Sequence, residues 1–274
     1  MRHSQVRHSL DIYRRLVGVQ LRSQLQYRAS FALDLIMTAL TVVVEFGAIA
    51  LVMQRFDNIQ GWQLPEIAFL YGLVEIAFNF MDMLFSGFDP PRFGLTVRQG
   101  TFDQLLLRPV NITAQVMGSR LVIRRLGRVA FGIAIFAYAL SLNDIVWTMP
   151  KLIYLPVVII SLIAFFGGLF IIGGTITFWT VDSIEVLNML TYGGGFTMSY
   201  PMTIYPNWLR RFFTYIVPAV FLNFYPALYF LDKPDPFDFP DFAPFVAPLV
   251  GFAMLWLSLR VWRFGIQHYQ STGN

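Results

Sequence analysis

Three acidic side chains, Glu45, Glu75 and Asp82, lie in stretches of sequence that are otherwise apolar enough to cross a membrane. An acidic group at the centre of a membrane-spanning helix costs about 2.5–3.5 kcal/mol on insertion scales, so such groups face a cavity or a partner rather than lipid. They could bind a cationic substrate, take up a proton, or hold neighbouring helices together through hydrogen bonds. We favour the packing interpretation, and a substrate path through the three acids is the alternative.

Other patterns that carry chemistry are sparse. There is no cysteine, which excludes disulfides, cysteine-based zinc sites and thiol catalysis. The three histidines lie near the ends of the chain, at His3, His8 and His268. An acidic run alternates with prolines and could hold calcium, but we interpret it as a solvated turn that proline stiffens; its acids are Asp232, Asp235, Asp238 and Asp241. We therefore expect no catalytic, cofactor-binding or metal site.

Neither lysine, Lys151 or Lys233, follows a glycine-rich loop or precedes a serine or threonine. The chain therefore has no Walker A phosphate-binding pattern, and we do not expect it to hydrolyse ATP. If the chain moves a substrate against a gradient, a partner protein must supply the energy.

The composition is that of an integral membrane protein. Of 274 residues, 56% are hydrophobic and 13% are charged, against roughly 45–50% and about 25% in soluble domains. A membrane-spanning helix needs about 20 mostly apolar residues. The sequence predicts six such spans: Phe31–Met53, Ile67–Phe85, Leu121–Leu142, Leu152–Phe178, Ile184–Tyr205 and Phe242–Trp262.

Two further segments have a distinct pattern. Residues 207–231 are apolar but interrupted by Pro218 and Pro226, which favours a re-entrant hairpin shielded by protein over a seventh span. Gly193–Gly195 would weaken the fifth span by about 1 kcal/mol per residue, so we interpret it as a hinge.

Arginine sets the expected orientation. With six spans, fifteen of the twenty basic residues fall on the side that holds both termini. The positive-inside rule makes that side cytoplasmic, so we expect a multi-pass protein of the inner or plasma membrane with both termini in the cytoplasm. Arg120, Arg124 and Arg128 repeat every four residues and are expected to reach the membrane surface, where they could attract anionic lipid or an anionic substrate. No soluble basic domain exists to bind nucleic acid.

Two cytoplasmic helices are expected. Residues 9–28 read as an amphipathic helix in the membrane interface, capped by Ser9, with Ile12, Leu16 and Val19 on one face. It is either an anchor or a contact for a cytoplasmic partner.

The second helix begins at Thr101 in the arginine-rich loop between spans two and three. Thr101 and Gln104 fit a capping box, Phe102 and two leucines line one face, and Pro109 ends the helix. A helix this short is unstable alone and must pack against something. We interpret it as a docking element for another protein.

The segment Gly100–Pro109 resembles the G-T-x-D-x-L-L-L-R-P loop of ABC-2-type transporter permeases. Further stretches match the six-span branch of that family in the same order: 178–183, 192–194, 200–206 and 225–227. The resemblance runs over essentially the whole chain.

The resemblance implies the permease subunit of an ATP-driven exporter for a hydrophobic or amphiphilic compound, a lipid or a glycan. Its partners would be ABC ATPase subunits and a second ABC-2 permease, a different chain, within membrane lipid. The ATPase-docking residues would be Thr101, Phe102, Asp103, Gln104, Leu105, Leu106 and Arg108.

The expected fold is all-α, with six transmembrane helices, the N-terminal interfacial helix and the re-entrant hairpin. Its parts are a cytoplasmic segment 1–28, a transmembrane domain 29–265 with a coupling loop 89–118 and the re-entrant segment 207–231, and a cytoplasmic tail 266–274. An integral membrane lipid-modifying enzyme is the alternative function. A passive channel or scaffold would explain the spans but not the docking helices.

Overall fold

The computed structural model describes residues 15, 17–56, 58–180 and 185–271, and within them every regular element is helical. The α-helices are α2 (Arg28–Arg55), α3 (Leu64–Phe85), α4 (Pro90–Arg98), α5 (Thr101–Leu106), α6 (Ile112–Ser119), α7 (Leu126–Leu142), α8 (Met149–Thr180), α9 (Glu185–Asn188), α10 (Gly194–Met198), α11 (Asn207–Arg211), α12 (Phe224–Phe230) and α13 (Ala247–His268). Residues 17–25 form a further helix, called here the N-terminal helix.

Short 3-10 and π segments join these helices. The 3-10 turns are η1 (Ser86–Phe88), η2 (Ile123–Arg125), η4 (Met202–Ile204), η6 (Ala219–Leu222) and η7 (Ala243–Val246). The π turns are η3 (Met189–Gly193) and η5 (Phe212–Ile216).

Five helical segments of the described chain are long and apolar enough to cross a membrane: Arg28–Arg55, Leu64–Arg98, Ile123–Leu142, Met149–Thr180 and Ala243–His268. Five of the six predicted spans correspond to these segments, although the predicted starts at Leu121 and Phe242 lie two residues and one residue before the helical segments begin. The predicted fifth span, Ile184–Tyr205, is wrong as a single long helix, because the helix of residues 185–198 passes through the π turn η3 and ends at the bend before Pro201. The Asn207–Ile216 and Ala219–Phe230 segments form a bent pair, with 74° between them, that could count as a sixth span.

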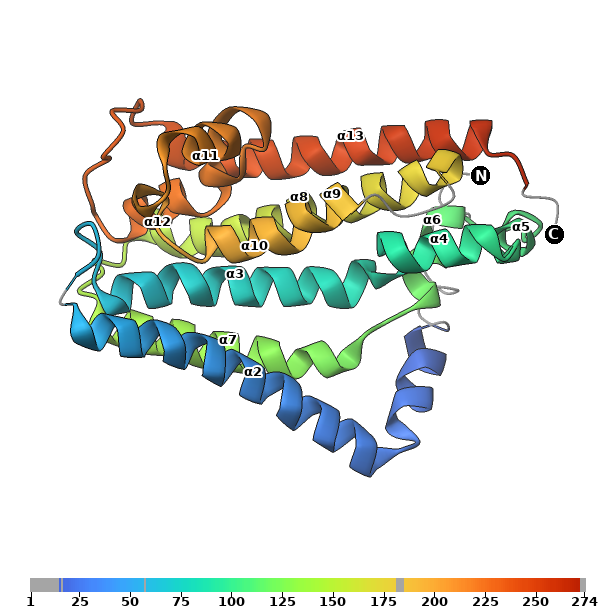
Figure 1. The fold of residues 1–274 in the computed structure, drawn as a ribbon, viewed down its shortest axis with the longest axis horizontal. Coiled ribbons are helices and arrows are strands. Elements are labelled where there is room, and N and C mark those ends of the chain that lie inside the picture. The colour runs from blue at the N-terminus through green and yellow to red at the C-terminus, as the bar shows by residue number, and fades with distance from the viewer. Residues whose placement is uncertain (1–14, 16, 57, 181–184, 272–274) are drawn as a thin grey trace.

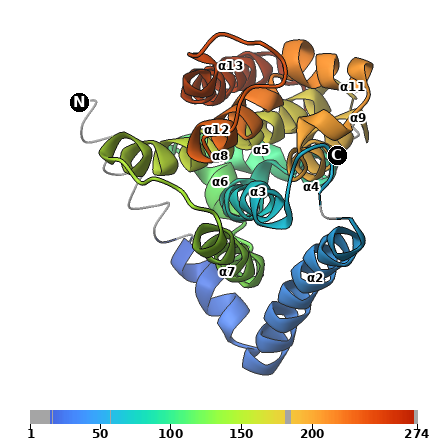
Figure 2. The ribbon, with the colours of Figure 1, turned by 90° about the vertical axis from the view of Figure 1, so that its left-hand side faces the viewer.

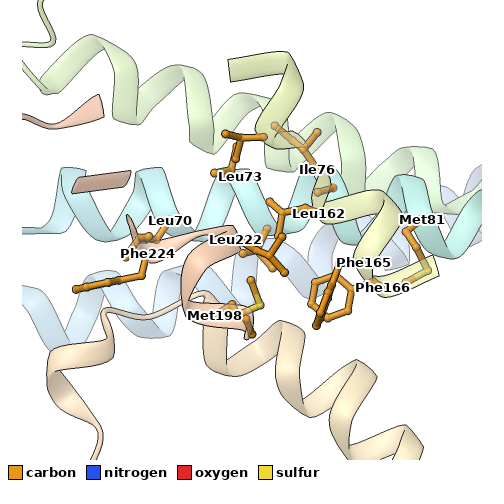
Figure 3. Close-up of a cluster of buried hydrophobic side chains, with 14 of the residues drawn as sticks. Leu70, Leu73, Ile76, Met81, Leu162, Phe165, Phe166, Met198, Leu222 and Phe224 are labelled. Atoms are coloured by element: carbon orange, nitrogen blue, oxygen red, sulfur yellow. The ribbon is translucent and has the colours of Figure 1, made fainter. Parts of the chain in front are cut away.

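The long helices run side by side, and α3 lies near the middle of the bundle (Figures 1 and 2). Its first turn is held by a capping box, in which Gln63 and Glu66 exchange side-chain and backbone hydrogen bonds. Apolar side chains of α3 then interlock with those of α8, α10, η6 and α12 (Figure 3). The buried core therefore lies around α3, and α2 is the peripheral helix.

The contact between α8 and α13 depends on a residue without a side chain. A Cβ placed on Gly251 of α13 would lie 2.3 Å from the Ser161 carbonyl oxygen of α8. Small residues let helix backbones approach closely in membrane proteins. The two helices consequently pack along their length (Figure 1).

The two ends of the bundle differ. Helices α4, α5 and α6 gather at one end, near the last described residues of α13, and α11 and α12 lie at the other (Figure 1). The N-terminal helix leaves α2 at a sharp angle at the α4–α6 end. It is tied there by Gln20 and Gln24, whose side-chain amides donate to the carbonyl oxygens of Ser119 and Leu121. The predicted cap at Ser9 and the predicted face residues Ile12 and Leu16 lie outside the described residues.

Candidate functional site

Arg128 of α7 binds acids on two other helices. Its Nη2 lies 2.7 Å from Oε2 of Glu45 on α2 and 3.0 Å from Oε1 of Glu75 on α3. Its Nε donates to Oε2 of Glu75 at 3.2 Å. Two carboxylates and one guanidinium therefore share a partly buried site that joins three helices.

Neutral side chains complete this network. The Tyr71 hydroxyl donates to Glu45 at 3.1 Å, and the Asn79 amide donates to Glu75 at 2.8 Å. The expectation that Arg128 reaches the membrane surface is wrong, because the carboxylates of Glu45 and Glu75 bind its guanidinium group between the helices. Buried charges persist when they are paired and hydrogen-bonded in this way.

The third predicted acid, Asp82, lies two turns further along α3 and pairs with Arg125 of η2. Each acid singled out in the sequence thus has a basic partner, as the packing interpretation expects. Sequence reasoning missed Arg125 and Arg128 as these partners.

Glu45 and Glu75 also line a cavity of about 270 Å³, called here the polar cavity. Arg128, Asn79 and Ser199 contribute polar groups to its wall, and Phe196 and Tyr192 contribute aromatic ones. Asp82 is not among its lining residues. The polar cavity could hold a small polar or charged group, as the substrate-path interpretation expects.

A larger and more apolar groove lies beside this cavity. It has a volume of about 1010 Å³ and lies between the 185–198 helix and α11–η5, with Met189, Trp208 and Phe212 in its wall. Tyr192 borders both the apolar groove and the polar cavity. Tyr192 belongs to the π turn η3, directly before Gly193. Such π turns often occur at functional sites.

The predicted docking helix corresponds to α5, and its residue Phe102 points inward. Phe102 is fully buried, with its ring 5.5 Å from Phe93, 5.0 Å from Phe178 and 6.1 Å from Trp262. The expected apolar face of Phe102, Leu105 and Leu106 is therefore split, because Phe102 is buried while Leu106 is exposed. Phe102 anchors α5 to the ends of α4, α8 and α13, which supplies the packing that such a short helix needs.

The other predicted docking residues form the outer edge of α5. Thr101, Gln104, Leu106 and Arg108 are exposed, Asp103 and Leu105 are half-buried, and the neighbouring Leu107 is 85% exposed. The predicted capping box is wrong. The N-cap is Gly100 with a φ of 66°, and no side-chain capping hydrogen bond forms. Glycine adopts this left-handed backbone without strain, and it turns the chain between α4 and α5.

The predicted C-terminal tail is seated against α5. The ring of Tyr269 lies 5.0 Å from that of Phe102, and the Ser271 hydroxyl donates to Asp103 at 2.6 Å. Burial and the nearby Asp103 carboxylate raise the pKa of Tyr269 to about 12. The sequence offered no signal for this contact.

At the opposite end, two consecutive residues of the acidic run bind different helices. Asp232 accepts two hydrogen bonds from Lys151 of α8, at 2.8 and 2.7 Å, and Lys233 lies 2.6 Å from Glu66 of α3. Asp235 accepts from the backbone amides of Phe237 and Phe239. Within the described ranges, no group of three acids or histidines is placed to hold a metal ion.

The match of this chain to a family of known proteins agrees with this architecture. Residues 39–273 match the family described as "ABC-2 family transporter protein". Neither the curated proteins nor the solved structures gave a match.

Proposed function

Because the chain belongs to the ABC-2 family of transporter proteins, we propose that it is the permease of an ATP-driven exporter. Members of this family are membrane components of transporters rather than enzymes, and they associate with ABC ATPase subunits. The chain is accordingly a multi-pass membrane protein. In the proposed exporter it forms half of the pathway for a hydrophobic or amphiphilic compound, a lipid or a glycan.

The outer edge of α5 is the observation that carries the proposal. An 85%-exposed Leu107 follows a helix whose Phe102 is fully buried. A rigidly anchored helix with an exposed apolar edge is suited to dock a partner and to pass its movement to the bundle. We assign ATPase docking to Thr101, Gln104, Leu106, Leu107 and Arg108, with Phe102 as the anchor.

The apolar groove and the polar cavity support a pathway for an amphiphile. The groove offers about 1010 Å³ lined largely by apolar side chains, and the polar cavity offers about 270 Å³ lined by charged ones. Tyr192 separates them. An apolar moiety fits the first space and a cationic or hydrogen-bonding group fits the second, because the wall there carries Glu45 and Glu75 against Arg128.

The remaining parts of the proposal concern assembly and membrane. A second, different permease supplies the other half of the pathway. The bent pair over Asn207–Phe230 enters the outer side of the inner or plasma membrane as the re-entrant segment. Both termini lie in the cytoplasm, and the N-terminal helix lies in the membrane interface.

The test is purification of the tagged chain from its native membrane in mild detergent, with mass spectrometry of the associated proteins. A single cysteine at Leu107 provides a cross-linking site, since the chain has no other cysteine. The matched control is a cysteine at Phe56, which is also exposed but lies at the opposite end of α2.

An ABC ATPase cross-linked at Leu107→Cys but not at Phe56→Cys is the expected result. Recovery of a second permease with it would support the heteromeric assembly, and recovery of the ATPase alone would favour two copies of this chain. If no ATPase is recovered with either cysteine, the assignment of ATPase docking to the outer edge of α5 is wrong.

A further inference from the structure

A polar cleft of about 750 Å³ lies at the α4–α6 end of the bundle, and it shares Arg92 with the apolar groove. The N-terminal helix and the first turns of α2 form one wall, and the segment from Ser119 to Arg124 lies across from it. Residues of η1 and α4, with Arg92 among them, complete the lining. The Gln20 and Gln24 amides bridge the two walls. The cleft is therefore a defined space with fixed sides.

Arginine dominates the charge of this cleft. Arg92, Arg120 and Arg124 line it, and Asp34 is the acid among its lining residues. Arg92 pairs with Asp89 at 3.0 Å. Within the part of the chain that the structure describes, the Arg120 and Arg124 side chains have no hydrogen-bond or ion-pair partner. Two guanidinium groups are thus left available to an anion.

Arg120 lies near two other arginines. Burial lowers the pKa of Arg120, and the charges of Arg92 and Arg124 lower it further, against the opposite effects of Asp89 and Asp82. An arginine remains charged under these conditions. An anion placed between the three groups would relieve their mutual repulsion.

The rest of the lining suits a phosphate group. Ser23, Ser30 and Tyr27 bring hydroxyl groups to the cleft, and Gln20 brings an amide. Guanidinium groups bind phosphate oxygens through two parallel hydrogen bonds, and hydroxyl groups can donate to the remaining oxygens. A carboxylate ligand would use fewer of these donors.

The outer face of α2 indicates that this phosphate belongs to a lipid. Ser30 and Asp34 line the cleft, and Leu33, Ile36 and Met37 of the same two turns are exposed. Apolar side chains at the start of a membrane-spanning helix lie against acyl chains. A headgroup in the cleft would have its chains beside this face.

We propose that the cleft between the N-terminal helix and residues 119–124 is a binding site for the phosphate headgroup of an anionic phospholipid. Arg120 and Arg124 bind the phosphate, and Arg92 adds to the attraction. The bound headgroup holds the N-terminal helix against the 119–124 segment, which Gln20 and Gln24 already join.

The test uses the full-length chain, purified in detergent and stripped of lipid, with native mass spectrometry to count bound molecules. The probes are dioleoylphosphatidylglycerol, dioleoylphosphatidylcholine and inorganic phosphate. The variant is R120Q/R124Q. The control, R260Q/R263Q, removes the same two charges from exposed positions on α13.

Wild-type protein is expected to bind phosphatidylglycerol in preference to phosphatidylcholine. A basic residue contributes about fivefold to the affinity for anionic lipid, so R120Q/R124Q should weaken phosphatidylglycerol binding at the cleft by roughly 25-fold. R260Q/R263Q should leave binding at the cleft unchanged, because neither residue lines it. Equal binding of the two lipids, or equal losses in the two variants, would overturn the site. Competition by inorganic phosphate as effective as by lipid would overturn the assignment to a lipid.

A second measurement keeps the arginines intact and so does not depend on the variant's folding. A cysteine at Ser23, labelled with an environment-sensitive dye, reports on the cleft wall. Phosphatidylglycerol should shift its emission, while a label at Phe56→Cys should not respond. A response to phosphatidylcholine of the same size would contradict the proposal. Neither measurement requires an ATPase, so both stand apart from the proposed transport function.

Discussion

Arg128 binds Glu75 through two of its nitrogen atoms, with Nε 3.2 Å from Oε2 and Nη2 3.0 Å from Oε1. This geometry orients both side chains and leaves Nη2 in contact with Glu45 as well. Loss of the guanidinium would leave two carboxylates near each other without a counter-charge. Removing Arg128 should therefore lower the stability of the protein more than removing the charge of Glu75.

We expect Arg128→Met to lower the free energy of unfolding by about 3–5 kcal/mol, because breaking a buried pair leaves uncompensated charge. Glu75→Gln should have a smaller effect, since the amide still accepts a hydrogen bond and Glu45 still balances Arg128. Thermal denaturation in detergent measures both. The exposed Arg263→Met is the control, and an Arg128→Met protein as stable as this control would contradict the expectation.

The Glu75→Gln variant also distinguishes the packing interpretation of the acids from the substrate-path interpretation. If Glu75 serves packing, the Glu75→Gln protein keeps transport in reconstituted vesicles together with its ATPase. Loss of transport in a correctly assembled Glu75→Gln complex would instead support the substrate path.

At the Lys151–Asp232 pair, the two partners differ in exposure, and we expect an asymmetric response. The Lys151 side chain is 5% exposed and the Asp232 side chain is 60% exposed. Asp232→Asn would leave a buried ammonium group without its counter-ion, at a loss of roughly 1–3 kcal/mol. Asparagine also tolerates the φ of 51° at this position, so the backbone is not disturbed.

Lys151→Met should be closer to neutral, because the remaining Asp232 reaches water and the apolar side chain fills similar space. Denaturation of the two single variants under identical conditions measures the difference. A Lys151→Met protein that is less stable than Asp232→Asn would show that solvent does not compensate Asp232.

Substitutions at Phe102 and Leu107 should distinguish the residue that anchors α5 in the permease from the residue that contacts the ATPase. Phe102→Ala removes a buried ring and should destabilise the protein by about 3–5 kcal/mol. Leu107→Ala should leave the thermal stability unchanged, because that side chain is 85% exposed, and should reduce recovery of the ATPase. Loss of stability in Leu107→Ala would show that the residue packs within the permease instead.

Two glycine positions offer a matched test of the α8–α13 contact. Gly251→Ala would place a Cβ 2.3 Å from the Ser161 carbonyl oxygen, and overpacking of this kind costs about 1–3 kcal/mol. Gly47→Ala in α2 meets no atom within 4 Å and should stabilise the helix by up to about 1 kcal/mol. Denaturation midpoints of the two variants should therefore move in opposite directions. Movement in the same direction would contradict the close backbone contact.

The long apolar helices could be predicted from the sequence, because hydropathy over a window depends little on tertiary contacts. The exception was the segment after α8, where apolar composition alone could not reveal the π turn η3 or the bend before Pro201. Those features depend on how the backbone closes around Gly193–Gly195 and on packing against Phe78 and Phe166.

The acids of the site could also be predicted, since charge is conspicuous in an apolar helix. Their partners could not, because Arg128 has the same sequence context as arginines that face the membrane surface. Which arginine points into the bundle depends on the rotation of α7 about its axis relative to α2 and α3. The inward position of Phe102 escaped prediction for a similar reason. Its partners Phe178 and Trp262 come from distant parts of the chain.

The contacts of Arg128 have a mechanical consequence. One guanidinium on α7 is bonded to carboxylates on both α2 and α3. A sliding movement of any one of these helices past the others would separate charges in a medium that cannot solvate them. The three helices should therefore move as one rigid body, and the displacements of a working cycle should take place along its boundary with the 185–198 helix, where Phe78 of α3 packs against Tyr192 and Gly195.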